Sequence, residues 1–146
     1  MHLDKDVEDK INSIKAKLPN TLINSLGIEF KSIKKNELIA TMPVDHRTKQ
    51  PFGILHGGAN VALAETLASI GGWLNLADDI EGEKSNVVGL EINANHIRAV
   101  TTGHVTAKAT PIHIGRSTQI WEIKILNEED KLVCISRCSL FCRKIN

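Results

Sequence analysis

One carboxylate stands alone in a long apolar segment. Glu65 is the only ionisable residue between positions 57 and 77. Removing a carboxylate from water is unfavourable by several kcal/mol unless it is paired or hydrogen-bonded. Ser69 follows four residues later, so a helix would place it on the same face, one turn away. Such a pair can hold a water or a small substrate atom for acid–base or nucleophilic chemistry. The competing interpretation, that Glu65 lies on an exposed stripe or pairs with a distant arginine, carries comparable weight.

A second chemical feature precedes the same segment. His56, Gly57 and Gly58 place flexible backbone amides at the expected start of a helix. Unsatisfied N–H groups and the helix dipole favour negative charge there. One such donor can stabilise a developing oxyanion by roughly 3–4 kcal/mol. Taken alone, the glycine pair is also typical of an ordinary tight turn.

The spacing of these two features predicts how they could work together. Gly57 and Glu65 are eight residues apart, which is ~12 Å along an α-helix. A reacting carbonyl must lie within a few ångströms of both groups, and one helix cannot easily supply both. Two antiparallel copies of the helix, meeting across a two-fold axis, could do so. If these residues form a site, it is a site shared by a dimer.

The rest of the chain predicts the elements that hold this helix. The long helix is expected from His56 to Ala77, and its four glycines, two asparagines and glutamate argue against a membrane span. Periodicity and turn residues predict one domain over 1–146. An amphipathic helix is expected at 3–18, a hairpin at 28–43, an irregular segment at 44–55 and a polar loop at 78–85. Four strands should follow, at 87–98, 103–114, 117–127 and after a turn at 127–130. The order is that of an α+β fold, with a buried helix against an antiparallel sheet.

Composition limits the classes of partner. The formal net charge is +1, and aromatic residues make up only 3% of the chain, with no tyrosine. Neither a basic surface nor stacking platforms for nucleic acid are therefore expected, and no membrane partner is implied. The first eight residues alternate in charge with no apolar run behind them, which does not resemble a secretory signal. We expect a cytoplasmic protein with reduced thiols.

Several chemistries lack their motif. The sequence contains no G-x-S-x-G, no dinucleotide or P-loop glycine pattern and no H-E-x-x-H. The three cysteines, Cys134, Cys138 and Cys142, are spaced by four residues, so a strand would place them on one face. That pattern favours packing over metal binding, and no metal or other cofactor is expected.

Four segments together resemble a known family. The stretches 45–58, 64–69, 89–96 and 111–116 are similar to the hotdog-fold acyl-CoA thioesterases. The branch they resemble contains 1,4-dihydroxy-2-naphthoyl-CoA hydrolase, which belongs to menaquinone biosynthesis, and the enterobactin-pathway and phenylacetate-pathway thioesterases. The resemblance covers nearly all of the chain after residue 20. It implies a hotdog fold, in which about five to six antiparallel strands wrap one long helix.

The resemblance also implies a role for particular residues. The Gly57 amide would polarise the thioester carbonyl, while Gln50 and His56 order the loop before the helix. Glu65 of the facing subunit would attack the carbonyl or activate a water oriented by Ser69. The substrate-binding residues implied by the family lie near the acyl pocket (His96 and Ile70) and near the CoA nucleotide (His113, Gly115, Arg116 and Ser117). The planar donor fork of an arginine suits a phosphate.

The function implied is hydrolysis of an acyl-CoA, with an aromatic acyl group favoured, by a homodimer that assembles into a dimer of dimers. The sequence leaves open the acyl group, the choice between a CoA and a carrier-protein thioester, and the nucleophile or general-base role of Glu65. The first alternative is a non-catalytic module that binds acyl-CoA or acyl carriers, because fold does not settle function. A hotdog dehydratase is a weaker alternative, since its His/Asp-type pattern is not found.

Overall fold

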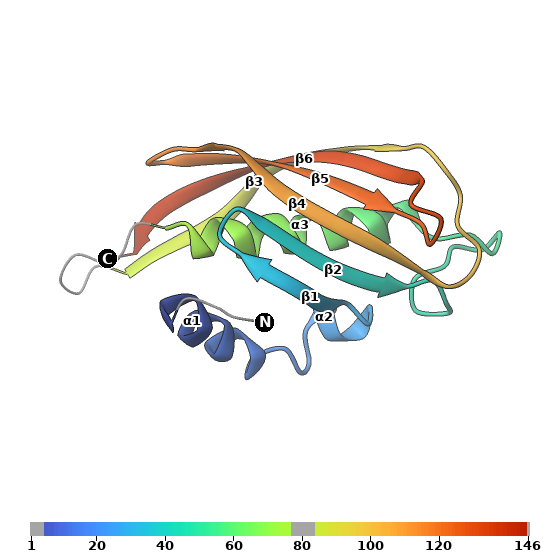
Figure 1. The fold of residues 1–146 in the computed structure, drawn as a ribbon, viewed down its shortest axis with the longest axis horizontal. Helices are drawn as coiled ribbons and strands as arrows, with labels where there is room; N and C mark the ends of the chain where they lie inside the picture. The colour runs from blue at the N-terminus through green and yellow to red at the C-terminus, as the bar shows by residue number, and fades with distance from the viewer. Residues whose placement is uncertain (1–4, 77–83, 146) are drawn as a thin grey trace.

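A computed structural model describes residues 5–76 and 84–145 of the chain (Figure 1). Two short helices come first, and a six-stranded antiparallel sheet surrounds one long helix. In chain order the elements are α1 (Lys5–Lys15), α2 (Leu22–Ser25), β1 (Glu29–Lys34), β2 (Glu37–Pro43), α3 (Gly57–Leu74), β3 (Lys84–His96), β4 (His104–Ile114), β5 (Thr118–Leu126) and β6 (Leu132–Ile145). The predicted α+β order is confirmed, and the described elements end within a few residues of the predicted bounds.

The strands follow the order β1-β2-β4-β5-β6-β3 across the sheet. The predicted hairpin is formed by β1 and β2, with Lys34 opposite Glu37. Strand β3 crosses to the far side of the sheet and pairs along its length with β6. It is therefore an edge strand, and no described strand pairs with its outer side. Figure 1 shows the sheet curving around α3, with α1 lying beside β1.

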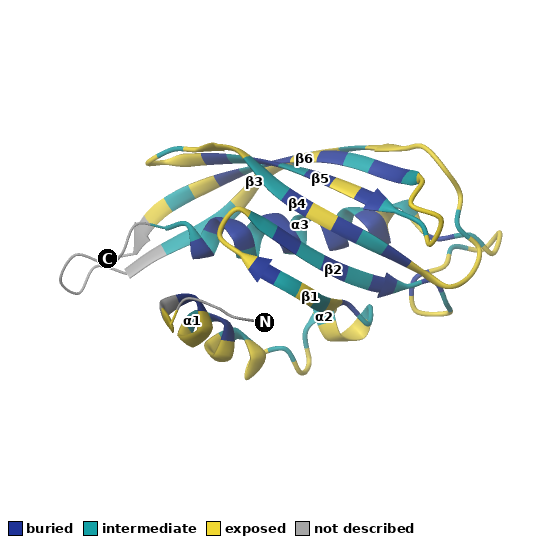
Figure 2. Cartoon of the chain, in the orientation of Figure 1, coloured by how far each residue is buried: buried dark blue, intermediate teal, exposed yellow. Residues whose placement is uncertain are grey.

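Alternation along the strands builds the inner face of the sheet. On β2 the buried residues are Leu38, Ala40 and Met42, which alternate with half-buried neighbours. The same two-residue period runs along β4, β5 and β6 (Figure 2). Successive side chains of a strand point to opposite faces, so this period turns one apolar face toward α3.

Helix α3 meets that face with leucine and with small residues. Leu63 and Leu67 are fully buried. A Cβ at Gly71 would lie 2.6 Å from the Trp121 ring, so only glycine lets the helix approach that indole. The Trp121 N–H donates to Gln119, and the Gln119 amide donates in turn to the Gly72 carbonyl at 3.1 Å. These two bonds satisfy the polar groups buried between β5 and the helix.

Helix α1 is shorter than the sequence pattern predicts, since it ends at Lys15 rather than at residue 18. Bonded turns follow, with Lys17 donating to Ile14 and Thr21 to Leu18. The long helix also ends earlier than predicted, at Leu74, and Asn75 is its C-cap residue. The predicted end, Ala77, lies outside the described residues. None of the described helices, α3 included, combines the length and hydropathy that crossing a membrane requires.

Candidate active site

The N-terminus of α3 is capped by the side chain that precedes it. His56 Nδ1 accepts a hydrogen bond from the Gly58 amide at 2.7 Å. That bond consumes one of the unsatisfied N–H groups of the first turn. The Gly57 amide is the first of the helix, and it donates to no described residue outside α3. A donor that is aligned with the helix dipole thus remains available to a ligand.

The loop before the helix is held by short-range bonds. The Gln50 amide donates to Ile54 at 2.9 Å, and Gly53 donates back to Gln50 at 3.0 Å with a φ of 83°. The side-chain oxygen of Gln50 accepts from the Phe52 amide. Because that oxygen is occupied, the Gln50 side chain presents its NH₂ donors. Gln50 and His56 therefore both make hydrogen bonds within the segment that enters α3.

His96, at the end of β3, lies over the start of the helix. A Cβ at Gly57 would approach its Nε2 to 2.8 Å. Only a glycine at position 57 allows the imidazole and the helix amide to share this space. The histidine is itself exposed. The structure thus brings His56, Gly57 and His96 into one cluster.

Glu65 lies two turns further along α3, against Gly89 near the middle of β3. Its carboxylate is half-buried, and a Cβ at Gly89 would lie 2.5 Å from its Oε1. The β3–β6 register shifts between Gly89 and Glu91, which leaves Leu90 as the extra residue of a bulge. Bulges re-aim strands and occur often beside active sites. Here the bulge and the missing side chain together make room for the carboxylate.

Ser69 and Ile70 follow on the same helix, and both are half-buried. Ser69 lies one turn beyond Glu65 on the same stripe. Ile70 lies farther around the helix and lines a cavity beside α1. The Glu65 carboxylate and the Ser69 hydroxyl therefore lie on one stripe of α3, and their joint use in a reaction stays a prediction.

The predicted nucleotide-binding residues occupy the β4–β5 hairpin. His113 is near the end of β4, Gly115 donates to Thr118 at 2.8 Å, and Arg116 and Ser117 are exposed. Thr118 is opposite Phe141, and Phe141 is opposite Val88 of β3. Neighbouring strands are ~4.8 Å apart, so two strand spacings separate this hairpin from the strand that carries Gly89. The predicted residues thus form three groups: one at the start of α3, one from its middle to Ile70, and one at the hairpin.

Two residues near Glu65 were not predicted to belong to the site. Gly89 was visible only as a glycine inside a strand, which signals a bulge or a close approach. Cys138 is fully buried on β6, and burial raises the pKa of its thiol to about 12, with a further contribution from the Glu65 and Glu91 carboxylates. A thiol with such a pKa is no nucleophile at neutral pH.

The other cysteines behave as packing residues as well. Burial raises the pKa of Cys134 and of the half-buried Cys142, and all three thiols are free. The predicted packing role is confirmed by the burial of Cys134 and Cys138. Across the described residues, no cluster of three or more histidine, cysteine, aspartate or glutamate side chains could hold a metal ion.

Comparison with known proteins decides the family. A profile described as the thioesterase superfamily matches residues 52–134, which include the helix entry, Glu65 and most of the sheet. The chain belongs to the thioesterase superfamily. It is a thioester hydrolase, and the family prediction made from the four segments is confirmed.

Curated relatives carry more specific names. The chain is 50% identical over 123 residues to the 1,4-dihydroxy-2-naphthoyl-CoA hydrolase of Listeria monocytogenes, covering 84% of this chain and 96% of the relative. It is 46% identical over 127 residues to the enzyme of the same name in Escherichia coli, covering 87% and 90%.

A solved structure supports the fold. A thioesterase from Haemophilus influenzae superposes with a TM-score of 0.82 at 51% identity, covering 90% of this chain and 89% of that protein. The fold is the hotdog fold, as the sequence resemblance predicted.

Proposed function

We propose that the protein hydrolyses acyl-CoA thioesters with an aromatic acyl group, using Gly57 of one protomer and Glu65 of a second. The observation that carries this proposal is the geometry of α3. Its free Gly57 amide and its half-buried carboxylate are on one helix, eight residues and ~12 Å apart. No single carbonyl can contact both groups of one chain, whereas an antiparallel pair of helices brings them together.

The surface around these groups supports a second copy. Three large apolar side chains are exposed on the loop before α3 and on β3 and its continuation: Phe52 at 91%, Leu90 at 59% and Ile97 at 54%. Strand β3 also leaves one backbone edge unpaired among the described strands. Exposed apolar groups beside an open strand edge favour association with another chain. We propose a homodimer that completes the site, and a dimer of dimers as the full assembly.

The reaction needs two contributions at the carbonyl. The Gly57 amide and the dipole of α3 stabilise the negative charge that develops on the thioester oxygen. Glu65 takes a proton from a water held near Ser69, and the resulting hydroxide adds to the carbonyl carbon. Collapse of the tetrahedral intermediate breaks the C–S bond, and the CoA sulfur leaves with the proton from Glu65. Direct attack by Glu65, through an anhydride that water then hydrolyses, gives the same products.

The remaining predicted residues take supporting roles. Gln50 and His56 hold the loop that enters α3, and His96 lies over Gly57, beside the place proposed for the thioester carbonyl. The hairpin at 113–117 receives the CoA phosphates, with Arg116 as the bidentate donor. The aromatic acyl group is proposed because the relatives named above act on 1,4-dihydroxy-2-naphthoyl-CoA by name. No metal or cofactor is proposed, and the cytoplasmic location stays a prediction.

The proposal is tested by release of free CoA from benzoyl-, 1,4-dihydroxy-2-naphthoyl-, phenylacetyl- and decanoyl-CoA. Glu65→Gln removes the base while keeping the shape of the side chain, so kcat should fall by ~10²–10⁴-fold. The Tm should stay close to that of the wild type. Glu129→Gln, the same change at an exposed turn, is the matched control and should leave kcat unchanged.

Two results would contradict parts of the proposal. Near-full activity of the folded Glu65→Gln variant would remove the carboxylate from the mechanism. An active species that sediments as a monomer would remove the shared site. A folded wild-type protein that binds acyl-CoA and releases no CoA would instead favour the non-catalytic binding module.

A further inference from the structure

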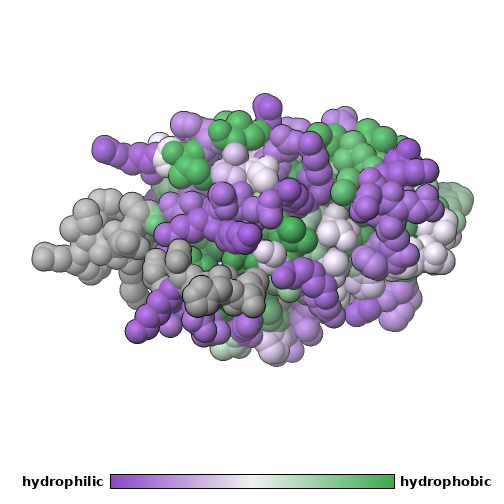
Figure 3. Space-filling view, viewed as in Figure 1, coloured by the Kyte–Doolittle hydropathy of each residue, from purple (hydrophilic) through white to green (hydrophobic). Residues whose placement is uncertain are grey.

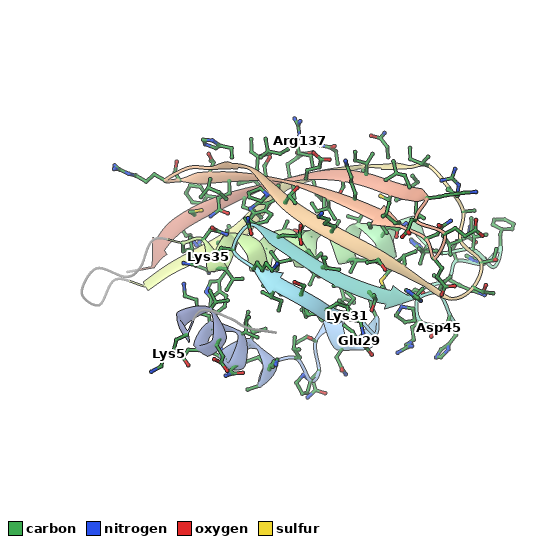
Figure 4. The ribbon with its side chains drawn as sticks, viewed as in Figure 1. Lys5, Glu29, Lys31, Lys35, Asp45 and Arg137 are labelled. Carbon is green, nitrogen blue, oxygen red and sulfur yellow. The ribbon has the colours of Figure 1, made fainter. Side chains whose placement is uncertain are left out.

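A partly open apolar cavity lies between α1, β1 and α3. Its volume is about 370 Å³, within the range of ~300–1,000 Å³ typical of ligand pockets. Seven of the nine described residues that line it are apolar. The two charged residues are Lys15 and Glu29, both exposed. The Glu29 carboxylate bonds to Lys31 at 2.8 Å, so its charge is engaged along the outside of β1 (Figure 4).

Helix α1 packs closely at its N-terminal side and leaves the cavity open under its C-terminal side. Val7 and Ile11, in its N-terminal half, are 3% and 4% exposed. Lys10 adds a contact with the next layer, since its Nζ lies 5.6 Å from the centre of the Trp73 ring on α3. Ile14 and Leu18, one and two turns further, are only half-buried, and together with Ile11 they line the cavity.

The cavity walls therefore keep apolar surface in contact with water. Ile14 and Leu18 face it from α1 and the turn that follows, Phe30 from β1 and Ile70 from α3, and each of the four is half-buried. Polar and charged side chains cover much of the surrounding surface (Figure 3). Water in such a cavity finds few hydrogen-bonding partners, so an apolar group that displaces it binds favourably.

The position of Ile70 connects this cavity to the reaction. Ile70 directly follows Ser69 and is five residues beyond Glu65, which is ~7.5 Å along the helix axis and ~140° around it. When a carbonyl is held beside the Glu65 carboxylate, its acyl substituent can extend along this stretch of α3 toward Ile70. A short acyl group ends before Ile70, whereas a longer or bicyclic group reaches the cavity beyond.

We infer that the cavity under α1 receives the distal part of the acyl group, and that α1 sets the largest acyl group the enzyme accepts. The inference rests on the proposed function and adds the size class of its substrate: acyl groups with an extended apolar end, either a fused ring system or a chain of medium length. Ile14 and Leu18 are the specificity-determining residues on the α1 side, and Ile70 forms the boundary with the reactive centre.

The experiment compares the ratio of kcat/KM for decanoyl-CoA to that for butyryl-CoA. Ile14→Trp fills the cavity and should lower this ratio at least about tenfold, because the long chain loses its place. Ile14→Ala enlarges the cavity and should shift the preferred chain length upward. Asn12→Trp adds the same bulk to the exposed face of α1 and should leave the ratio within about twofold of the wild type.

Binding is measured in parallel so that the two proposals can fail separately. Calorimetry of decanoyl-CoA and butyryl-CoA on Glu65→Gln, with and without Ile14→Trp, reports acyl preference without turnover. A wild type that releases no CoA contradicts the proposed function only, and the binding preference then decides the cavity. If Ile14→Trp does not fold, as judged by its Tm, Ile14→Ala decides.

Two outcomes would overturn the inference. The first is a folded Ile14→Trp variant whose ratio and binding preference equal those of Asn12→Trp. The second is a change of sedimenting mass in Ile14→Trp with an unchanged ratio, which would show that a second copy of the chain covers the cavity instead.

Discussion

The two faces of α3 differ in what they can tolerate. The face toward the sheet is closed: Leu67 is fully buried, and Gly71 lies against the Trp121 ring with no space for a side chain. The opposite face is half-open and carries Glu65 and Ser69. The first face is therefore close-packed, while the second carries polar groups that are only partly covered by the chain. Stability depends on the first face, and the proposed reaction uses the second.

Hydrophobicity alone does not distinguish these faces. The helix is apolar or small nearly all round, so its sequence carries little amphipathic signal. What distinguishes them is the partner: one face packs on the sheet within the chain, and in the proposed function the other face meets a second copy and a substrate. The following substitutions separate the two faces experimentally, in order of decreasing expected effect.

Leu67→Ala should give the largest change in stability. Deleting a fully buried leucine side chain lowers the free energy of unfolding by about 2–5 kcal/mol. Ser69→Ala, two residues along on the half-open face, should change it by less than about 0.5 kcal/mol. Urea titration of both variants measures the difference. Equal losses would show that the two faces are packed alike.

Gly89→Ala should act on the reaction more than on the fold. The added Cβ would lie 2.5 Å from Oε1 of Glu65 and must displace the carboxylate. A displacement of this size should lower kcat/KM by ~10–100-fold. Asn93→Ala, on the exposed side of the same strand, is the matched control. Unchanged kcat/KM in Gly89→Ala would show that Glu65 does not act from its observed position.

Substitution of a buried cysteine should give the smallest change in stability. Burial and two nearby carboxylates raise the pKa of Cys138 to about 12, so the thiol stays protonated in the folded state at pH 8. A soluble disulfide reagent should leave it unmodified until the protein unfolds. The unfolded thiol ionises near pH 9 and the folded thiol only near pH 12, so the contribution of Cys138 to stability is complete below pH 9 and is lost progressively between pH 9 and about 12. Urea midpoints of Cys138→Ala and wild type, measured at pH 8 and pH 10, should therefore converge at the higher pH.

Much of the fold was predictable from local patterns. The polar turn between β1 and β2, the two-residue period of β4 and β5 and the long apolar helix each leave a signal in the chain. Helix ends were less predictable, because the apolar period continues to Leu18, past Lys15 where α1 ends. Leu18 keeps its apolar contact from a turn instead.

The site was predictable as residue types and not as an arrangement. Glu65 and the glycine pair could be found from their neighbours in the sequence. The approach of Gly89 to Glu65 and of His96 to Gly57 depends on how β3 returns beside the helix, across a bulge that no local pattern fixed. The cavity under α1 depends on three elements distant in the chain, and nothing in the sequence indicated it.

The segment from Gly57 to Glu65 also limits how the length of this protein can change during evolution. Each residue inserted into an α-helix turns everything after it by ~100° and advances it by 1.5 Å. One insertion between these positions would move the carboxylate off β3 and toward α1, although it would leave the composition of the helix nearly unchanged. In the proposed function the helix therefore fixes the spacing between Gly57 and Glu65, and an insertion or deletion between them should be less tolerated than a point substitution.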